Sequence, residues 1–144
     1  MIAIWILGGI AFSGVLWWAL SADFNRFARK RKDEPLYPES LFKVAVTDSE
    51  IIAHRPDGTV ERVSIAELKE LYIVTTSAGP WSPDVWWLFV GSASGSGCSF
   101  PGGASGEHEA LHFAQQLPGF DNAAFITAMG STSDAKFLCW QAAA

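Results

Sequence analysis

The first 22 residues carry no charged side chain, and most of them are apolar. A helix of this length spans roughly 33 Å at about 1.5 Å per residue, close to the roughly 30 Å hydrocarbon core of a bilayer. The pattern therefore predicts a transmembrane helix over residues 1–22. Tryptophan side chains favour membrane interfaces, and three are expected to anchor the two ends of the helix: Trp5, Trp17 and Trp18.

A cluster of basic side chains directly after this stretch predicts its orientation. It consists of Arg26, Arg29, Lys30, Arg31 and Lys32. Because basic residues are retained on the cytoplasmic side, the N-terminus is predicted outside and the rest of the chain in the cytoplasm, at a bacterial inner membrane. A cleaved signal peptide is the alternative, but the apolar run is long and no basic segment precedes it.

Small residues within the apolar stretch indicate a possible helical partner. Gly9 and Ser13 are four positions apart, a spacing that lets two helices approach closely in lipid. Glycine is also common in membrane helices in general, so this spacing has an equally simple explanation. After the helix, residues 23–41 are predicted as the basic juxtamembrane segment followed by an acidic, proline-containing linker.

Beyond residue 41 the apolar positions recur every second residue, which predicts strands in a cytoplasmic domain over residues 42–144. The Pro56-Asp57-Gly58 sequence predicts a hairpin turn, and Ser64 to Glu67 has the spacing of a helix capping box. Strands come first and helices late, so we expect an α+β domain: a small antiparallel sheet or half-barrel with C-terminal helices. Strands are expected over 42–46, from 51, and over 60–63, 71–76, 85–90, 98–100 and 136–140; helical segments over 65–70, 105–117 and 121–129.

The order of these elements resembles that of small bacterial membrane-anchored PH-like domains of unknown function. The resemblance covers residues 42–117 and is carried by four stretches: 47–51 (TDSEI), 55–58 (RPDG), 84–87 (DVWW) and 117–120 (LPGF). It implies a PH-like fold that binds lipid, peptide or protein. The basic lipid-binding loop is absent, because acidic residues surround Arg55 and Arg62 in the first hairpin.

Charge separates the chain into two unlike parts. Residues 1–32 contain five bases and one acid, net +4, whereas residues 33–144 contain five bases and fourteen acids, net −9. The acidic balance argues against a nucleic-acid partner and against binding of the domain to anionic lipid. Two cysteines, Cys98 and Cys139, are too few for a disulfide scaffold and are expected to be reduced in a cytoplasmic domain.

One motif suggests chemistry. His108-Glu109-Ala110-Leu111-His112 matches the H-E-x-x-H spacing, in which two histidines bind zinc and the glutamate acts as general base. No His or Glu follows His112 to complete the ligand set, and the motif begins its predicted helix directly after a glycine-rich segment. We therefore expect an ordinary amphipathic helix and no metal or other cofactor. A membrane-tethered zinc hydrolase using His108, Glu109 and His112 is the alternative.

Tryptophans in the middle of the domain are candidates for contact with a partner. Trp81, Trp86 and Trp87 could form an aromatic patch, although alternation along a strand favours at least one of Trp86 and Trp87 in the core. The sequence leads us to expect a non-catalytic accessory or assembly subunit of a larger integral-membrane protein complex, with no identified small-molecule substrate. A PH-like module that binds lipid or peptide is a further alternative.

Overall fold

Strand-forming segments dominate the computed structural model of the chain, which describes residues 37–77, 84–93 and 96–143. Within these residues seven strands form two antiparallel sheets, one of three strands and one of four. Several features predicted from the sequence lie outside the described residues: the helix over 1–22, Gly9 and Ser13, the anchors Trp5, Trp17 and Trp18, the basic cluster from Arg26 to Lys32, and Trp81.

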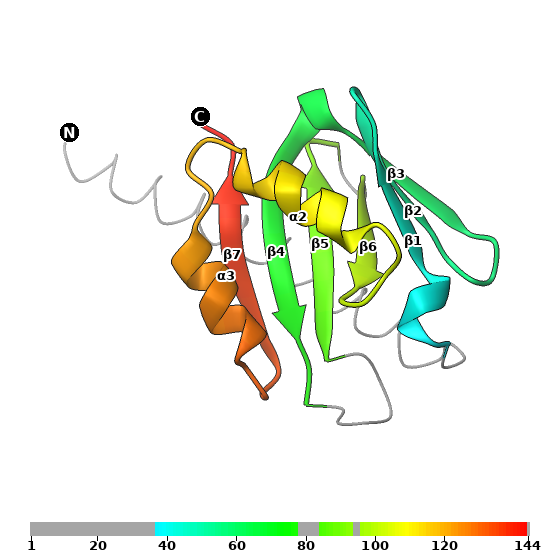
Figure 1. Cartoon of the computed structure of the whole chain (residues 1–144). Helices are drawn as coiled ribbons and strands as arrows, with labels where there is room; N and C mark the ends of the chain where they lie inside the picture. Colours follow the sequence, from blue (N-terminus) through cyan, green and yellow to red (C-terminus); the bar gives the residue numbers. More distant parts are fainter. Residues whose placement is uncertain (1–36, 78–83, 94–95, 144) are drawn as a thin grey trace, which may run out of the picture. The chain divides into compact units, whose positions relative to one another are not determined.

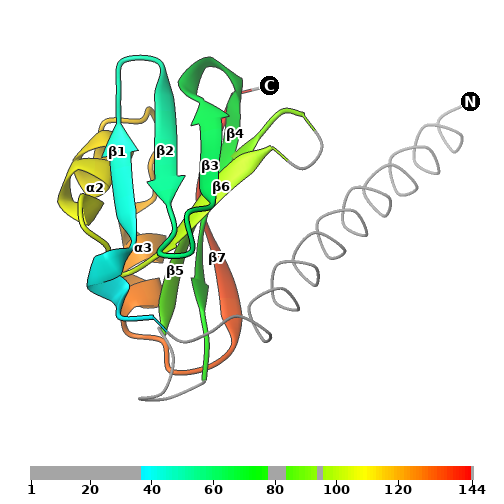
Figure 2. The same cartoon turned by 90° about the vertical axis from the view of Figure 1, so that its right-hand side faces the viewer.

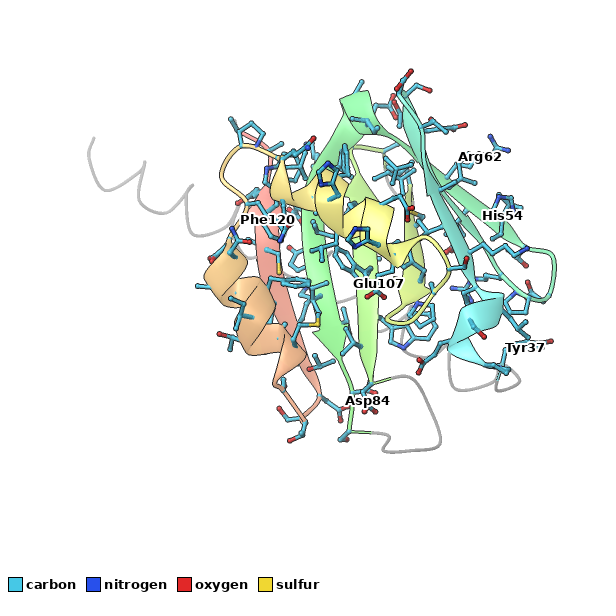
Figure 3. All side chains as sticks on the ribbon, in the orientation of Figure 1. Tyr37, His54, Arg62, Asp84, Glu107 and Phe120 are labelled. Carbon is cyan, nitrogen blue, oxygen red and sulfur yellow. The ribbon has the colours of Figure 1, made fainter. Side chains whose placement is uncertain are left out.

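The three-stranded sheet has the order β1-β2-β3 and follows a short 3-10 turn, η1 (Glu39–Leu41). Its strands are β1 (Lys43–Val46), β2 (Glu50–His54) and β3 (Val60–Ser64), close to the ranges that the alternation predicts. The predicted turn between β2 and β3 is confirmed, because Gly58 adopts a φ of 91° that other residues rarely reach. His54 and Arg62 project outward from this sheet (Figure 3).

The four-stranded sheet has the order β6-β5-β4-β7, so the last strand of the chain lies beside β4 and not beside its neighbour in sequence. All its pairings are antiparallel. The strands are β4 (Leu68–Thr75), β5 (Val85–Gly91), β6 (Gly97–Pro101) and β7 (Ala135–Gln141).

Two short helices cover one face of this sheet: α2 (Glu107–Gln115) and α3 (Asn122–Met129) (Figures 1 and 2). Asp121 caps the N-terminus of α3, since its carboxylate accepts a hydrogen bond from Ala124 N at 2.9 Å. Beneath the helices lies an aromatic core around Trp87, which is 1% exposed. Its ring lies 5.5 Å from that of Phe125 on α3 and 5.7 Å from that of Phe100 on β6.

The predicted fold class is wrong. The described residues form a mostly-β domain of two sheets and two short helices, and not an α+β half-barrel with C-terminal helices. No helix among the described residues is long and apolar enough to cross a membrane. The periodicity of the apolar residues predicted the positions of most strands and helices, but the fold class depends on which distant strands pair. Here β7 returns to the sheet after the helices, so strand pairing and not helix packing completes the domain.

The segment over 65–70 also differs from its prediction. Only a single 3-10 turn forms, η2 (Ile65–Glu67), and the Ser64 side chain makes no capping hydrogen bond. Leu68 already belongs to β4 and is buried. The packing of this apolar side chain into the sheet therefore overrides the local capping-box signal, as tertiary contacts commonly override local propensity.

Candidate functional site

The H-E-x-x-H motif occupies the first turn and a half of α2. His108, Glu109 and His112 are all exposed, because the buried side of this helix is formed by Ala110 and Ala114. His112 Nε2 lies 2.9 Å from Gln116 Nε2. Within the described part of the chain, no three His, Cys, Asp or Glu side chains are grouped so that they could hold a metal ion. The two histidines therefore share a helix side without the third protein ligand that a catalytic zinc requires.

The tryptophans of β5 lie in the interior of the domain. Trp87 faces the helices, whereas Trp86, its neighbour in the strand, points to the opposite side and packs edge-on against Phe42, with ring centroids 5.8 Å apart. Both side chains are buried because β5 is a central strand that is covered on its two faces. Neither Trp86 nor Trp87 therefore contributes to an exposed aromatic patch on this domain.

The two cysteines are buried, unpaired thiols. Burial raises the pKa of Cys98 to about 12, and the nearby Glu61 carboxylate adds to this effect. Burial likewise raises the pKa of Cys139 to about 11. A thiol must be deprotonated to act as a nucleophile or metal ligand, so both cysteines behave at neutral pH as small apolar side chains of the core.

A buried polar cluster joins the two sheets. Arg55, just after β2, lies with its Nε 3.6 Å from Glu61 Oε1 on β3 and donates from Nη2 to Ser99 Oγ on β6 at 3.2 Å. Glu61 Oε1 also accepts from the Ser99 backbone N and from Ser99 Oγ, at 3.1 and 3.2 Å. Charged groups removed from water need such partners, so the cluster holds the β2–β3 hairpin against β6. These contacts link residues of the β2–β3 hairpin to β6, so the cluster has a clear structural role.

A carboxylate at the start of α2 has a perturbed pKa. Glu107, labelled in Figure 3, accepts a hydrogen bond from Gly103 N at 2.6 Å. Its pKa lies above the ordinary value because burial disfavours the charged form and Glu39 repels it, although the Gly103 hydrogen bond acts in the opposite direction. This carboxylate therefore lowers the stability of the folded domain when it is ionised.

We expect Glu107→Gln to stabilise the domain at neutral pH. A carboxyl group with a raised folded-state pKa binds protons more readily in the folded than in the unfolded chain, so stability falls as the pH rises through its titration range. The variant removes this loss and keeps an oxygen that can accept from Gly103 N. Urea midpoints of the full-length chain should be equal at pH 3 and higher for the variant at pH 7. A lower midpoint for the variant at pH 7 would show that the ionised form stabilises the fold.

The most exposed apolar side chains near the end of the chain gather on α3 and β7. Ile126 is 70% exposed and Met129 42% exposed, on neighbouring turns of α3, and Leu138 on β7 is 42% exposed. Helix α3 packs along β7 at the outer edge of the four-stranded sheet (Figure 1). We call these three residues the β7-edge surface. Ile126 and Met129 lie three residues apart on α3, and neighbouring exposed apolar side chains are typical of a surface that binds another protein.

The β7-edge surface extends around both sides of the sheet. Phe137 is opposite Ile73, which is opposite Trp87, so these three residues share the face that α3 covers. Leu138 follows Phe137 in the strand and therefore points to the other face. Ile126 and Met129 of α3 therefore lie on one side of the four-stranded sheet and Leu138 of β7 on the other.

The sequence does not mark these residues as a site. Its alternating pattern predicts the last strand, but the position of that strand at the edge of a sheet depends on pairing with β4. A signal was nevertheless present: no charged residue occurs between Asn122 and Ser133, and the exposed side of α3 carries Ile126 and Met129 beside the polar Asn122 and Thr127.

Comparisons with known proteins add no relative, since no family model, curated protein or solved structure matches the chain. The assignment of a function therefore depends on the residues and their geometry.

Proposed function

We propose that the domain binds another protein through the β7-edge surface, and that the chain acts as a non-catalytic accessory or assembly subunit of a larger membrane protein complex. The single observation that carries the binding role is the exposure of Ile126, Met129 and Leu138 at one edge of the domain. Leaving such apolar area in water is unfavourable, by about 25 cal/mol per Å², and contact with a partner removes it.

The membrane location in this proposal rests on the sequence. The uncharged stretch over residues 1–22 and the basic cluster from Arg26 to Lys32 support attachment to the inner membrane with the domain in the cytoplasm. The domain itself has a different character, because residues 33–144 combine net charge −9 with an uncharged segment at α3. A protein partner that buries this uncharged segment fits the domain better than an anionic membrane surface does.

Substitution of Ile126 tests the binding role. In the full-length chain, Ile126→Asp is expected to lower the yield of co-purifying protein from native membranes in mild detergent by about tenfold or more, as expected for a central interface residue whose loss costs at least about 1.4 kcal/mol. Folding should be unaffected, because the side chain is exposed. Quantitative mass spectrometry of the purified material, normalised to the chain itself, gives the measurement.

Val60→Asp is the matched control, since Val60 is 43% exposed and lies on β3, in the other sheet. It introduces the same charge at an exposed aliphatic position, although Val60 is less exposed than Ile126. Equal recovery of partner proteins with Ile126→Asp and with the unchanged chain would contradict the proposed function, as would an equal loss with Val60→Asp.

A further inference from the structure

The two histidines of the H-E-x-x-H motif lie on the same side of α2. Residues four positions apart on a helix are neighbours, with Cβ atoms about 5–6 Å apart. His108 and His112 are both exposed, whereas the buried side of the helix is formed by Ala110 and Ala114, each 0% exposed. Two imidazole rings at this spacing can reach one point in the solvent from successive turns, and a single metal ion is bound in this way where the motif holds zinc.

The first turn of α2 is fixed against β1. Val44 N donates to Ser105 O at 2.8 Å, and Ser105 N donates to Phe42 O at 2.8 Å. Gly106 follows with a φ of 90°, and a side chain at this position would collide with the carbonyl oxygen of Val44. His108 therefore belongs to a turn that is already ordered. Because the backbone is ordered beforehand, little conformational freedom is lost when both rings bind one ion.

The ring of His112 presents a nitrogen lone pair on this side of the helix. Its Nε2 lies 2.9 Å from the side-chain nitrogen of Gln116. An amide nitrogen is a donor, so with this contact Nε2 is the acceptor nitrogen of the ring. Neutral imidazole binds metals through such a nitrogen. An ion bound at Nε2 would replace the donor from Gln116.

The charges around the histidine pair favour a cation. The N-terminal end of a helix carries about half a positive charge, which opposes cation binding. The first turn of α2 also contains Glu107 and Glu109, however, and Glu109 is exposed beside His108. One ionised carboxylate carries a full negative charge and outweighs the helix dipole. The surrounding domain adds to this attraction, since residues 33–144 have a net charge of −9.

We infer that His108 and His112 bind a divalent transition-metal ion, with water in its remaining coordination positions. Imidazole suits Zn²⁺, Ni²⁺ and Cu²⁺, and the general order of affinities makes Cu²⁺ the tightest of these. A catalytic zinc has three protein ligands, and within the described residues no third His, Cys, Asp or Glu completes such a set. The site is therefore assigned ion binding and not hydrolysis, and it does not depend on the proposed partner of the β7-edge surface.

Metal titration of the full-length chain, prepared without an affinity tag, tests the site. Calorimetry in mild detergent with Cu²⁺, and separately with Zn²⁺, is expected to show about one bound ion per chain. His108→Ala and His112→Ala should each weaken binding by about tenfold or more, because even changes outside the ligand shell cost metal sites that much. His54→Ala removes the remaining histidine of the chain, which is exposed on β2, and should leave the affinity unchanged.

A variant with displaced histidines is the matched control for the spacing. His112→Ala combined with Gln116→His keeps two exposed histidines on α2 but separates them by about 12 Å along the helix. One ion cannot bridge this distance, since its bonds to nitrogen are about 2.0–2.1 Å long. Undiminished affinity in this variant or in His108→Ala would overturn the inference, as would loss of binding in His54→Ala.

Electron paramagnetic resonance of the Cu²⁺-loaded, unchanged chain gives a measurement that needs no variant. Two imidazole ligands are expected to split the copper signal by two nitrogens. A signal with one nitrogen or none would contradict the paired site, even if a variant failed to fold as judged by its circular dichroism.

Discussion

Replacement of Trp87 by alanine is expected to lower the free energy of unfolding by about 3–5 kcal/mol. Its ring is fully buried and contacts aromatic rings from a strand and from α3, including those of Phe100 and Phe125. Removing the indole leaves a large cavity where sheet and helix meet. Domains of this size are stable by only about 5–15 kcal/mol in total, so the loss is a large share of the whole. Urea unfolding of the full-length chain, followed by circular dichroism, gives the measurement.

Trp87→Phe is the matched control for this experiment. Trp87 Nε1 has no hydrogen-bond partner among the described residues, so phenylalanine removes volume without breaking a hydrogen bond. Its cost should therefore be well below that of alanine. A loss under about 1 kcal/mol for Trp87→Ala would be inconsistent with a core position, because truncation of a buried aromatic side chain costs several times more.

Loss of the Arg55 side chain should be similarly severe. Arg55→Ala is expected to cost about 3–5 kcal/mol, because it leaves the Glu61 carboxylate in the contact between the sheets without its cation. The Ser99 hydroxyl also loses the donor at 3.2 Å. The same urea experiment measures the effect, and weaker attachment of the β2–β3 hairpin should appear as faster amide hydrogen exchange in β2 and β3.

Arg62→Ala provides the comparison. Arg62 Nη1 lies 3.0 Å from Glu50 Oε1, a shorter separation than in the Arg55–Glu61 pair, but the Arg62 side chain is 60% exposed. Exposed ion pairs contribute only about 0–1 kcal/mol, so this variant should remain close to the unchanged chain. If the two variants lose the same stability, burial does not determine the strength of the Arg55 cluster.

Most strands could be predicted because their signals are local. The Pro56-Asp57-Gly58 turn needs only the conformational preferences of its own residues, and the apolar run from Val85 to Val90 indicates a strand buried on two faces, as β5 is. The prediction of helical turns over 65–70 was wrong because a non-local contact decides the conformation there. Burial of Leu68 in β4 stabilises this segment more than a helix cap would.

The candidate site was much harder to predict from the sequence. The residues that the sequence singled out, His108 and His112, form a recognisable spacing, and α2 places both in solvent. Trp86 and Trp87 were candidates because tryptophan is frequent in interfaces. Tryptophan is also frequent in cores, so the residue type alone does not distinguish an interface position from a core position. Ile126 and Leu138 have no chemical signature, and only their exposure marks them.

By itself the sequence determined the turns, the approximate limits of the strands and helices, and the contrast in charge between the two ends of the chain, because each of these depends on neighbouring residues. Only the tertiary structure decided that β7 pairs with β4, that Arg55 meets Glu61 and Ser99, and that α3 leaves Ile126 exposed at the sheet edge. These features depend on residues far apart in the chain, and their pairing is selected by the burial of the whole core. One alternating pattern of apolar residues is compatible with several strand orders. The position of β7 at a sheet edge therefore depends on which distant strands pair.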